Sequence, residues 1–410
     1  MNPTELQTPI LSGGIRSINF FNGRLLTARD LSREQEGNEE EHRRLGQAIG
    51  AGVARGLEVS PSITSTLAAP VLTIEPGLAI NRRGQILSVE ERTDVSLVRQ
   101  FGASSNAPIF GACQPLQTGA YVAGAGVYLL TLASAVGKEG RAVTSGLGTE
   151  NVSCNTDTVV QGIQFRLLPL NISAADLGDL THLRNRLAYR CFGVADPKVA
   201  TYFHDPFAAT LQGYGLIDEL RGVSLTDCEV PLAVLYWTAA KGIEFVDLWS
   251  ARRRLEPQSA AGSWAPFVNQ RRQSEAEAMF LQFEEQLRTI RLTESNLNTI
   301  VASQRFDYLP PVGLLPLNNS GASGAFTYQK FFEGLAYHPP IHLEAAMVEP
   351  LVHTCLLYGP INLVNNDPIK LFLIAEGAST RPYIIFTSAY VPFQAEARFD
   401  VTRWNFSNFA

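Results

Sequence analysis

The chain has 410 residues, and its 45% hydrophobic content supplies enough apolar side chains for several cores and excludes wholesale disorder. Its net charge of -6 argues against a general nucleic-acid-binding surface, which needs a basic excess to meet phosphates. The N-terminus MNPTELQTPILSGG lacks the basic start and apolar core of a secretory signal, and no apolar run is long enough for a bilayer span. We therefore expect cytoplasmic synthesis and no direct membrane insertion.

Residues 1–100 are expected to form an N-terminal helix followed by a small antiparallel sheet. Thr27 is predicted to cap the helix, with Asp30 in the capping-box position. The turn-forming pairs Pro76-Gly77 and Arg83-Gly84 separate short apolar runs, which indicates hairpins. A heptad-spaced stripe on this helix mixes apolar and polar side chains, which is typical of a helix that meets one particular neighbour; an ordinary surface helix is the alternative. The stripe consists of Leu31, Gln35, Asn38, His42, Leu45 and Ile49.

Residues 101–255 are expected to form a β-rich middle domain with one helix. Ser173 is predicted to cap that helix, and the apolar run from Pro231 to Trp249 reads as a hairpin that turns at Lys241-Gly242. The basic triplet 252–254 is interpreted as a solvated surface feature with ion-pair partners.

Residues 256–308 are expected to form one long helix, which begins between Pro266 and Ser274 and ends near Phe306. It carries a second heptad stripe, which predicts a coiled-coil-like seam. Either the chain's own helices or another subunit can cover this seam, and the sequence leaves both open. Glu294 interrupts it, which predicts a solvated end or an arginine partner. The seam consists of Ala276, Phe280, Phe283, Leu287, Ile290, Glu294, Leu297 and Val301.

Residues 309–410 contain regularly spaced short strands, which favour a β-sandwich-like C-terminal domain. The fold class expected for the whole chain is therefore α+β and multi-domain, with antiparallel β domains around the long helix. The C-terminal strands are expected at 341–348, 352–357, 369–375, 383–388 and 397–404.

The sequence offers little catalytic chemistry, and we expect a protein that is not an enzyme, with no catalytic, cofactor-binding or metal-binding residues. The best metal candidates are His338, His342, Glu344 and His353, but Pro339-Pro340 prevents the helical spacing of zinc enzymes. The acidic pair 284–285 and the acidic run 39–41 are expected on exposed helix faces, where no pKa rise is needed. The scattered cysteines predict reduced, buried thiols at Cys113, Cys154, Cys191, Cys228 and Cys355.

The runs FFNGRLLTARDLSREQ, GVARGLEV and EPGLAINRRGQILSV within the first ninety or so residues resemble a module of proteins linked to phage tails and phage-tail-like contractile injection systems. The resemblance implies an accessory structural part, at the baseplate or in a cage around it, present in symmetric copies. Its implied partners are further copies and other particle subunits such as baseplate, sheath or tube proteins. It implies incorporation into a tail-like particle, either released or docked at a membrane, and it carries over no catalytic residue.

Two alternatives remain open. One is a tail-fibre-like receptor-binding adhesin, which would use the C-terminal β-domain and an exposed aromatic cluster of Tyr383, Tyr390 and Phe393. The other is a hydrolase that depends on His338 or His353.

Overall fold

The computed structural model is an α+β protein built from helices and mainly antiparallel sheets. None of the helices among the described residues is long and apolar enough to cross a bilayer. The structure describes residues 12, 14–23, 25, 27–67, 69–97, 111–112, 124–140, 157–205, 207, 213–257, 270–317, 326–374 and 383–392.

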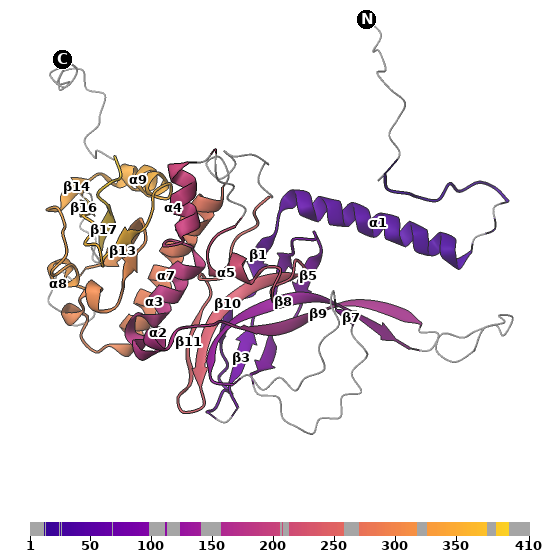
Figure 1. Ribbon diagram of the computed structural model, residues 1–410, viewed down its shortest axis with the longest axis horizontal. Coiled ribbons are helices and arrows are strands. Elements are labelled where there is room, and N and C mark those ends of the chain that lie inside the picture. The colour runs from indigo at the N-terminus through magenta and orange to yellow at the C-terminus, as the bar shows by residue number, and fades with distance from the viewer. Residues whose placement is uncertain are drawn as a thin grey trace, which may run out of the picture.

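The first helix, α1 (Ala28–Ile49), extends away from the rest of the chain and meets it at its C-terminal end (Figure 1). The predicted capping box is confirmed, because the Thr27 hydroxyl accepts from the Asp30 N–H and the Asp30 carboxylate accepts from the Thr27 N–H. At the other end Gly46 is buried against Gly84, where a Cβ on Gly46 would lie 2.1 Å from the Gly84 carbonyl oxygen. Close backbone packing therefore fixes α1 to the body.

Replacing Gly46 by alanine is expected to loosen this attachment. The methyl group has no room beside the Gly84 backbone, and this clash outweighs the helix-propensity gain of ~1 kcal/mol that alanine brings. Hydrogen exchange should accelerate in the C-terminal half of α1 and at residues 81–85. Gly37→Ala is the matched control on the same helix. Its Cβ would lie 3.1 Å from the Arg16 carbonyl oxygen, a tight contact that a small shift relieves, whereas the 2.1 Å contact at Gly46 requires a large one. Equal exchange in both variants would contradict the packing argument.

Two three-stranded antiparallel sheets follow α1, in the orders β1-β4-β5 and β2-β3-β6. The predicted Arg83-Gly84 turn joins β4 and β5 in a hairpin, and Gly84 has a φ of 79°, which glycine adopts without strain. The hairpin expected at Pro76-Gly77 is wrong, because β3 and β4 on either side of this pair belong to different sheets. The bounds are β1 Gly52–Gly56, β2 Val59–Pro61, β3 Val71–Ile74, β4 Gly77–Ile80, β5 Ile86–Val89 and β6 Thr93–Ser96.

A larger sheet crosses the middle of the molecule in the order β11-β10-β8-β7, with β9 paired to β8. The far ends of β8 and β9 form an arm that projects in the same direction as α1 (Figure 1). The hairpin predicted between 231 and 249 is confirmed as β10 and β11, with Gly242 at a φ of 77°. The bounds are β7 Gly111–Ala112, β8 Gly126–Glu139, β9 Thr158–Pro169, β10 Glu229–Thr238 and β11 Gly242–Asp247.

The two faces of this sheet belong to different cores because side chains alternate along a strand. On β8, Leu130 and Leu132 point into a core shared with the small sheets, whereas Val127 and Leu129 join a core formed with helices. Since the first core combines β1 and β3 with β8 and β10, the domain boundary expected at residue 100 does not separate two cores.

The helices that follow β9 are α2 Ala174–Gly178, α3 Leu180–Cys191, α4 Pro197–His204 and α5 Leu216–Leu220.

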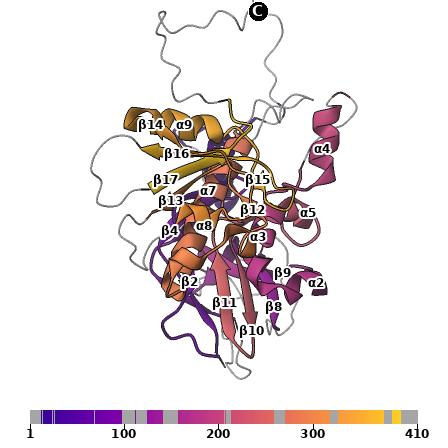
Figure 2. The same cartoon turned by 90° about the vertical axis from the view of Figure 1, so that its left-hand side faces the viewer.

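The C-terminal unit differs from the predicted β-sandwich. Its described strands form one mixed sheet in the order β13-β17-β16-β14 and a separate β12-β15 ribbon (Figure 2). The strand expected at 352–357 is wrong, because most of that segment lies in the helix α9 (Val348–Cys355). The strand expected at 397–404 lies outside the described residues. The bounds are β12 Tyr308–Leu309, β13 Val312–Pro316, α8 Tyr328–Phe331, β14 Ile341–Leu343, β15 Ile361–Asn362, β16 Ile369–Ile374 and β17 Tyr383–Ser388.

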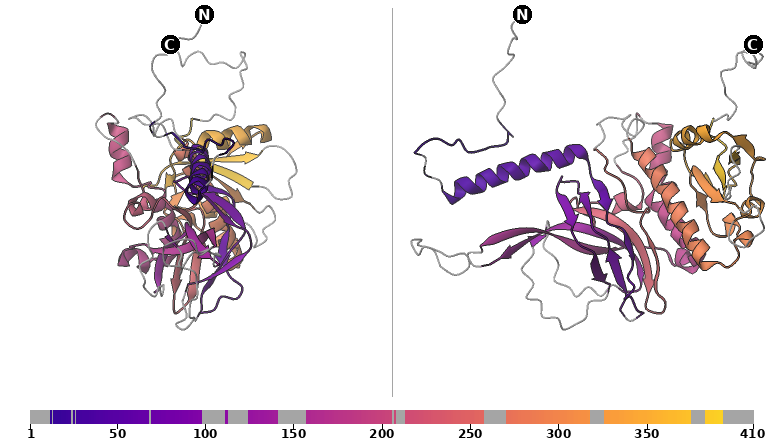
Figure 3. Two further views of the ribbon diagram at one scale, coloured as in Figure 1. Left: turned by 90° about the vertical axis from the view of Figure 1, so that its right-hand side faces the viewer. Right: turned by 180° about the vertical axis from the view of Figure 1, so that it is seen from behind.

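The long helix, α7, runs from Arg271 to Thr293 and ends earlier than expected. The chain continues through short 3-10 turns, η1 (Leu297–Thr299) and η2 (Ala302–Gln304); a third, η3 (Ala345–Met347), precedes α9. Helices α3 and α7 lie between the central sheet and the C-terminal sheet (Figure 3). The chain thus has a helical layer where its two sheet systems meet.

One cysteine overturns the expectation of reduced thiols. Cys228 is disulfide-bonded, and Cys113 and Cys154 lie outside the described residues. Cys191 and Cys355 are free and buried, and burial raises the pKa of each thiol to about 12. At neutral pH these two thiols are therefore protonated and poorly nucleophilic.

Candidate assembly surface

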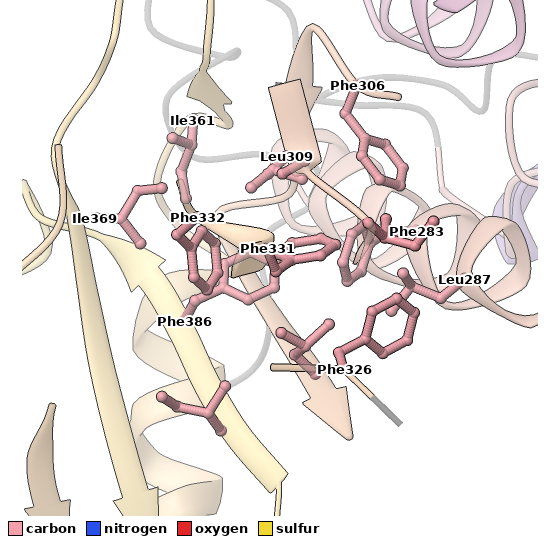
Figure 4. Close-up of a cluster of buried hydrophobic side chains, with 14 of the residues drawn as sticks. Phe283, Leu287, Phe306, Leu309, Phe326, Phe331, Phe332, Ile361, Ile369 and Phe386 are labelled. Atoms are coloured by element: carbon pink, nitrogen blue, oxygen red, sulfur yellow. The ribbon is translucent and has the colours of Figure 1, made fainter. Parts of the chain in front are cut away.

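The seam of the long helix is covered by this chain itself. All of its members are buried except Phe280 and Glu294, which are half-buried. Phe283 and Leu287 pack in a cluster with aromatic side chains of α8 and β17 (Figure 4), and the Phe283 and Phe386 rings lie 5.2 Å apart. The cover is thus mainly sheet and loop rather than a second long helix. The expectation of a coiled coil rests on heptad spacing alone, and spacing does not reveal which element lies opposite the helix.

The last two seam positions do not belong to the long helix. Glu294 ends α7 at its C-cap, and Leu297 and Val301 reach the same buried region from the 3-10 turns that follow. Glu294 pairs with Arg305 at 2.5 Å between Oε1 and Nη2, which is the arginine partner that the sequence suggested. The heptad spacing of apolar residues therefore extends beyond Thr293, where α7 ends.

The stripe on α1 has the opposite environment, because all of its members are exposed: Leu31, Gln35, Asn38, His42, Leu45 and Ile49. The exposed fractions of the Leu31, Leu45 and Ile49 side chains are 53%, 56% and 51%. The neighbouring sides of the helix are engaged elsewhere. The Ile18 N–H donates to Glu34 Oε2 at 3.0 Å, and Gln161 Nε2 on β9 donates to Glu39 Oε1 at 3.0 Å.

Further apolar side chains are exposed near this projecting end of the molecule. Phe20 and Phe21, which precede α1, are 58% and 62% exposed, and Val159 on the β8–β9 arm is 62% exposed. The helix and the arm extend in parallel from the body (Figure 3, right). Exposed apolar side chains on two projecting elements are typical of a surface that binds another protein.

A buried ionic cluster joins α3, β11 and α7. Arg184 Nε lies 2.6 Å from Asp247 Oδ2, and Arg184 Nη2 lies 2.8 Å from Glu285 Oε1. Asp247 also accepts from the Ser250 N–H at 3.0 Å and from Gln282 Nε2 at 3.0 Å. One guanidinium thus faces two carboxylates away from water, and it holds the helical layer to the central sheet.

The acidic pair 284–285 is half-buried and does not lie on the exposed helix face expected from the sequence. Burial and the negative charge of Asp247 raise the pKa of Glu285 to about 7, and burial raises the pKa of Glu284. The pattern missed this because α7 is buried on two sides, by α3 and by the C-terminal sheet. One signal in the sequence indicated a buried carboxylate partner: Arg184 lies between Leu183 and Leu187, on the buried face of a helix.

Replacing Glu285 by glutamine is expected to flatten the pH dependence of stability. A carboxyl whose pKa is about 7 in the folded state and near 4.5 when unfolded contributes stability that is full below pH 4.5 and is lost as the pH rises to about 7. Between pH 4.5 and pH 8 the free energy of unfolding of the variant should therefore fall less than that of the wild type, by on the order of 2 kcal/mol. Urea unfolding at pH 4.5, 6 and 8 measures this. Parallel pH profiles for both proteins would refute the assignment.

A second polar cluster lies at the start of α7. The Arg271 guanidinium stacks 3.7 Å above the Tyr214 ring, and its Nη1 lies 2.8 Å from Asp218 Oδ2 and its Nε 2.8 Å from Glu275 Oε1. The Tyr214 hydroxyl donates to Glu275 Oε2 at 2.8 Å, and burial beside this carboxylate raises the pKa of Tyr214. The cluster fixes the first turn of α7 to α5 and to the loop before it.

The basic triplet is not the solvated feature that the sequence suggested. Arg252 lies over the Trp249 ring, and Arg253 lies over the Phe192 ring at 4.8 Å. Arg253 also donates to the Trp249 carbonyl oxygen at 2.8 Å, and burial lowers its pKa. The expected ion pairs are present at Arg254, whose Nη1 lies 3.0 Å from Glu277 Oε2, and at Arg252, whose Nη1 lies 3.9 Å from Glu58 Oε1. The triplet is mainly a packing element.

The histidine candidates are spread over several elements. His342 lies on β14 and His353 on α9, where its Nε2 is 3.8 Å from Glu349 Oε1. The His338 N–H donates to the Ile369 carbonyl oxygen at 2.8 Å, as part of the sheet edge. Within the described ranges, no three His, Cys, Asp or Glu side chains are grouped as metal ligands would be.

The proposed aromatic binding cluster is only partly described. Tyr383 is half-buried at the start of β17, Tyr390 is 66% exposed, and Phe393 lies outside the described residues.

In a comparison with models of protein families and with curated proteins, the chain matches no family model and no curated sequence.

Proposed function

We propose that this chain is a non-enzymatic structural subunit of a phage-tail-like contractile injection particle. It would sit at the baseplate or in a cage around it, in symmetric copies that also contact other particle subunits. The resemblance of its first ninety or so residues to a module of such systems supports this proposal. The projecting helix α1, with exposed apolar side chains along one line, supports it as well.

The exposed stripe on α1 carries the proposal. A helix of 22 residues with heptad-spaced leucine and isoleucine side chains facing solvent is incomplete as an isolated element. The seam on α7 is internal, so it cannot also serve assembly without unfolding the C-terminal unit. Assembly contacts are therefore assigned to α1 and the adjacent β8–β9 arm.

Purification of the tagged full chain from its native host tests this proposal. Electron microscopy should show tail-like particles, and mass spectrometry should identify sheath and tube proteins in the eluate. Recovery of the chain alone, as a monomer or a small oligomer, would contradict the proposal and favour an independent binding protein.

The variant Leu45→Asp is expected to fold normally and to be lost from the particles. A carboxylate at a covered apolar position must be desolvated on assembly, which costs several kcal/mol. The measure is the amount of variant chain relative to sheath protein in purified particles. Val223→Asp is the control, because Val223 is 86% exposed on a turn remote from α1 in sequence. If the Leu45 variant enters particles as well as this control, α1 is not an assembly element.

A further inference from the structure

The edges of the α1 stripe carry charge of one sign. When α1 is assigned to heptads, the a positions are Gln35, His42 and Ile49, and the d positions are Leu31, Asn38 and Leu45. The charged residues that flank these positions are then Glu34, Glu39 and Glu41. At about 100° per residue, Arg29, Arg33 and Arg44 fall on the opposite side of the helix.

This charge pattern opposes pairing of the stripe with the same stripe of a second copy. In a parallel pair, Glu34 of one copy would face Glu39 of the other. In an antiparallel pair centred on the stripe, Glu39 would face Glu39 and Glu41 would face Glu41. Like charges at flanking positions are unfavourable in either orientation, so the stripe does not fit itself.

We propose that α1 binds a helix of a different protein, one that presents apolar side chains at heptad spacing between flanking lysine or arginine residues. The apolar ends of the stripe, at Leu31 and at Leu45 with Ile49, would be covered by the apolar residues of that helix. Gln35, Asn38 and His42 require hydrogen-bonding side chains opposite them, which fixes the register. This inference rests on the proposed function and names the chemistry of the neighbouring subunit.

The intramolecular contacts of α1 leave this stripe available. The N-terminal segment binds one side of the helix through Glu34, and the body binds another through Gly46 and Glu39. The donors to Glu34 and Glu39 are a backbone N–H and an amide, which carry no charge, so both carboxylates keep the negative charge that a basic partner would meet. Both contacts orient the helix without covering Leu31, Leu45 or Ile49. A partner helix would therefore meet a surface that is already held in place, which lowers the entropic cost of binding.

Site-specific photo-crosslinking in the native host tests the inference. A benzophenone amino acid replaces Asn38 in the full chain, and mass spectrometry identifies the crosslinked peptide. We expect a peptide of another protein with apolar residues at helical spacing and flanking basic residues. The same photo-reactive residue at Arg33, on the opposite side of α1, should not capture that peptide. Crosslinks to another copy of this chain, to an acidic or irregular segment, or to no protein would overturn the inference.

A charge reversal provides the second measurement. Glu41→Lys should cause loss of the crosslink from position 38, whereas Glu36→Lys, the same change away from the stripe, should retain it. Circular dichroism verifies that both variants keep their helix content. Particles without a basic-helix crosslink would overturn the inference and leave the proposed function intact. A basic-helix crosslink without particles would overturn the proposed function and support the docking chemistry. Loss of both would overturn both.

Discussion

Arg184→Met is expected to lower the free energy of unfolding by about 3–5 kcal/mol, because it leaves two carboxylates without their shared cation. The Arg184 side chain is 9% exposed and that of Asp247 is 1% exposed, so water cannot replace the lost contacts. Glu285 would lose the same partner at 2.8 Å. Chemical denaturation of the full chain measures the change.

The matched control lies on the same helix. Arg190 is 44% exposed and contacts Asp176 at 3.5 Å, so Arg190→Met should cost at most about 1 kcal/mol. If the two variants were equally stable, the ionic cluster would not hold α3, β11 and α7 together. A large loss only at Arg184 would establish the cluster as the main polar contact of the helical layer.

Phe283→Ala is expected to destabilise the C-terminal unit by about 3–5 kcal/mol, since it leaves a cavity in a close-packed aromatic core. The Phe283 side chain is 1% exposed and meets Phe306 at 5.5 Å and Phe386 at 5.2 Å between ring centroids. Calorimetry or urea unfolding of the full chain detects the loss. Charged substitutions at this position would be worse, so they report on folding before they report on assembly.

Leu292→Ala is the control for this second prediction. Leu292 lies on the same helix but is 82% exposed, and its truncation should change stability by at most about 0.5 kcal/mol. Should Phe283→Ala prove as mild as this control, the cluster around it would be loosely packed and the seam would again be a candidate contact surface.

The two heptad stripes show how far spacing alone leads. On both helices the spacing identified an apolar line, yet one line is buried in this chain and the other faces solvent. Heptad spacing describes one helix face, whereas coverage depends on segments that are distant in sequence, such as β17 against α7. For the same reason the sequence missed Glu285, whose neighbours Arg184 and Asp247 come from other elements.

Local features were predictable because neighbouring residues decide them. The Thr27–Asp30 capping box and the glycine turns at Gly84 and Gly242 depend on hydrogen bonds and backbone angles within a few residues. The segment around Val352 was not, since its short apolar run suits a strand or a helix equally, and packing of Leu351 and Cys355 under the C-terminal sheet selected α9.

By itself the sequence determined the caps, the tight turns and the apolar lines, because these follow from the chemistry of adjacent residues. Tertiary structure alone decided which line is internal, which carboxylate is buried beside another, and which side of α1 remains open. These outcomes are set by long-range packing, where the free energy of burial depends on what lies opposite a side chain rather than on its neighbours in the chain.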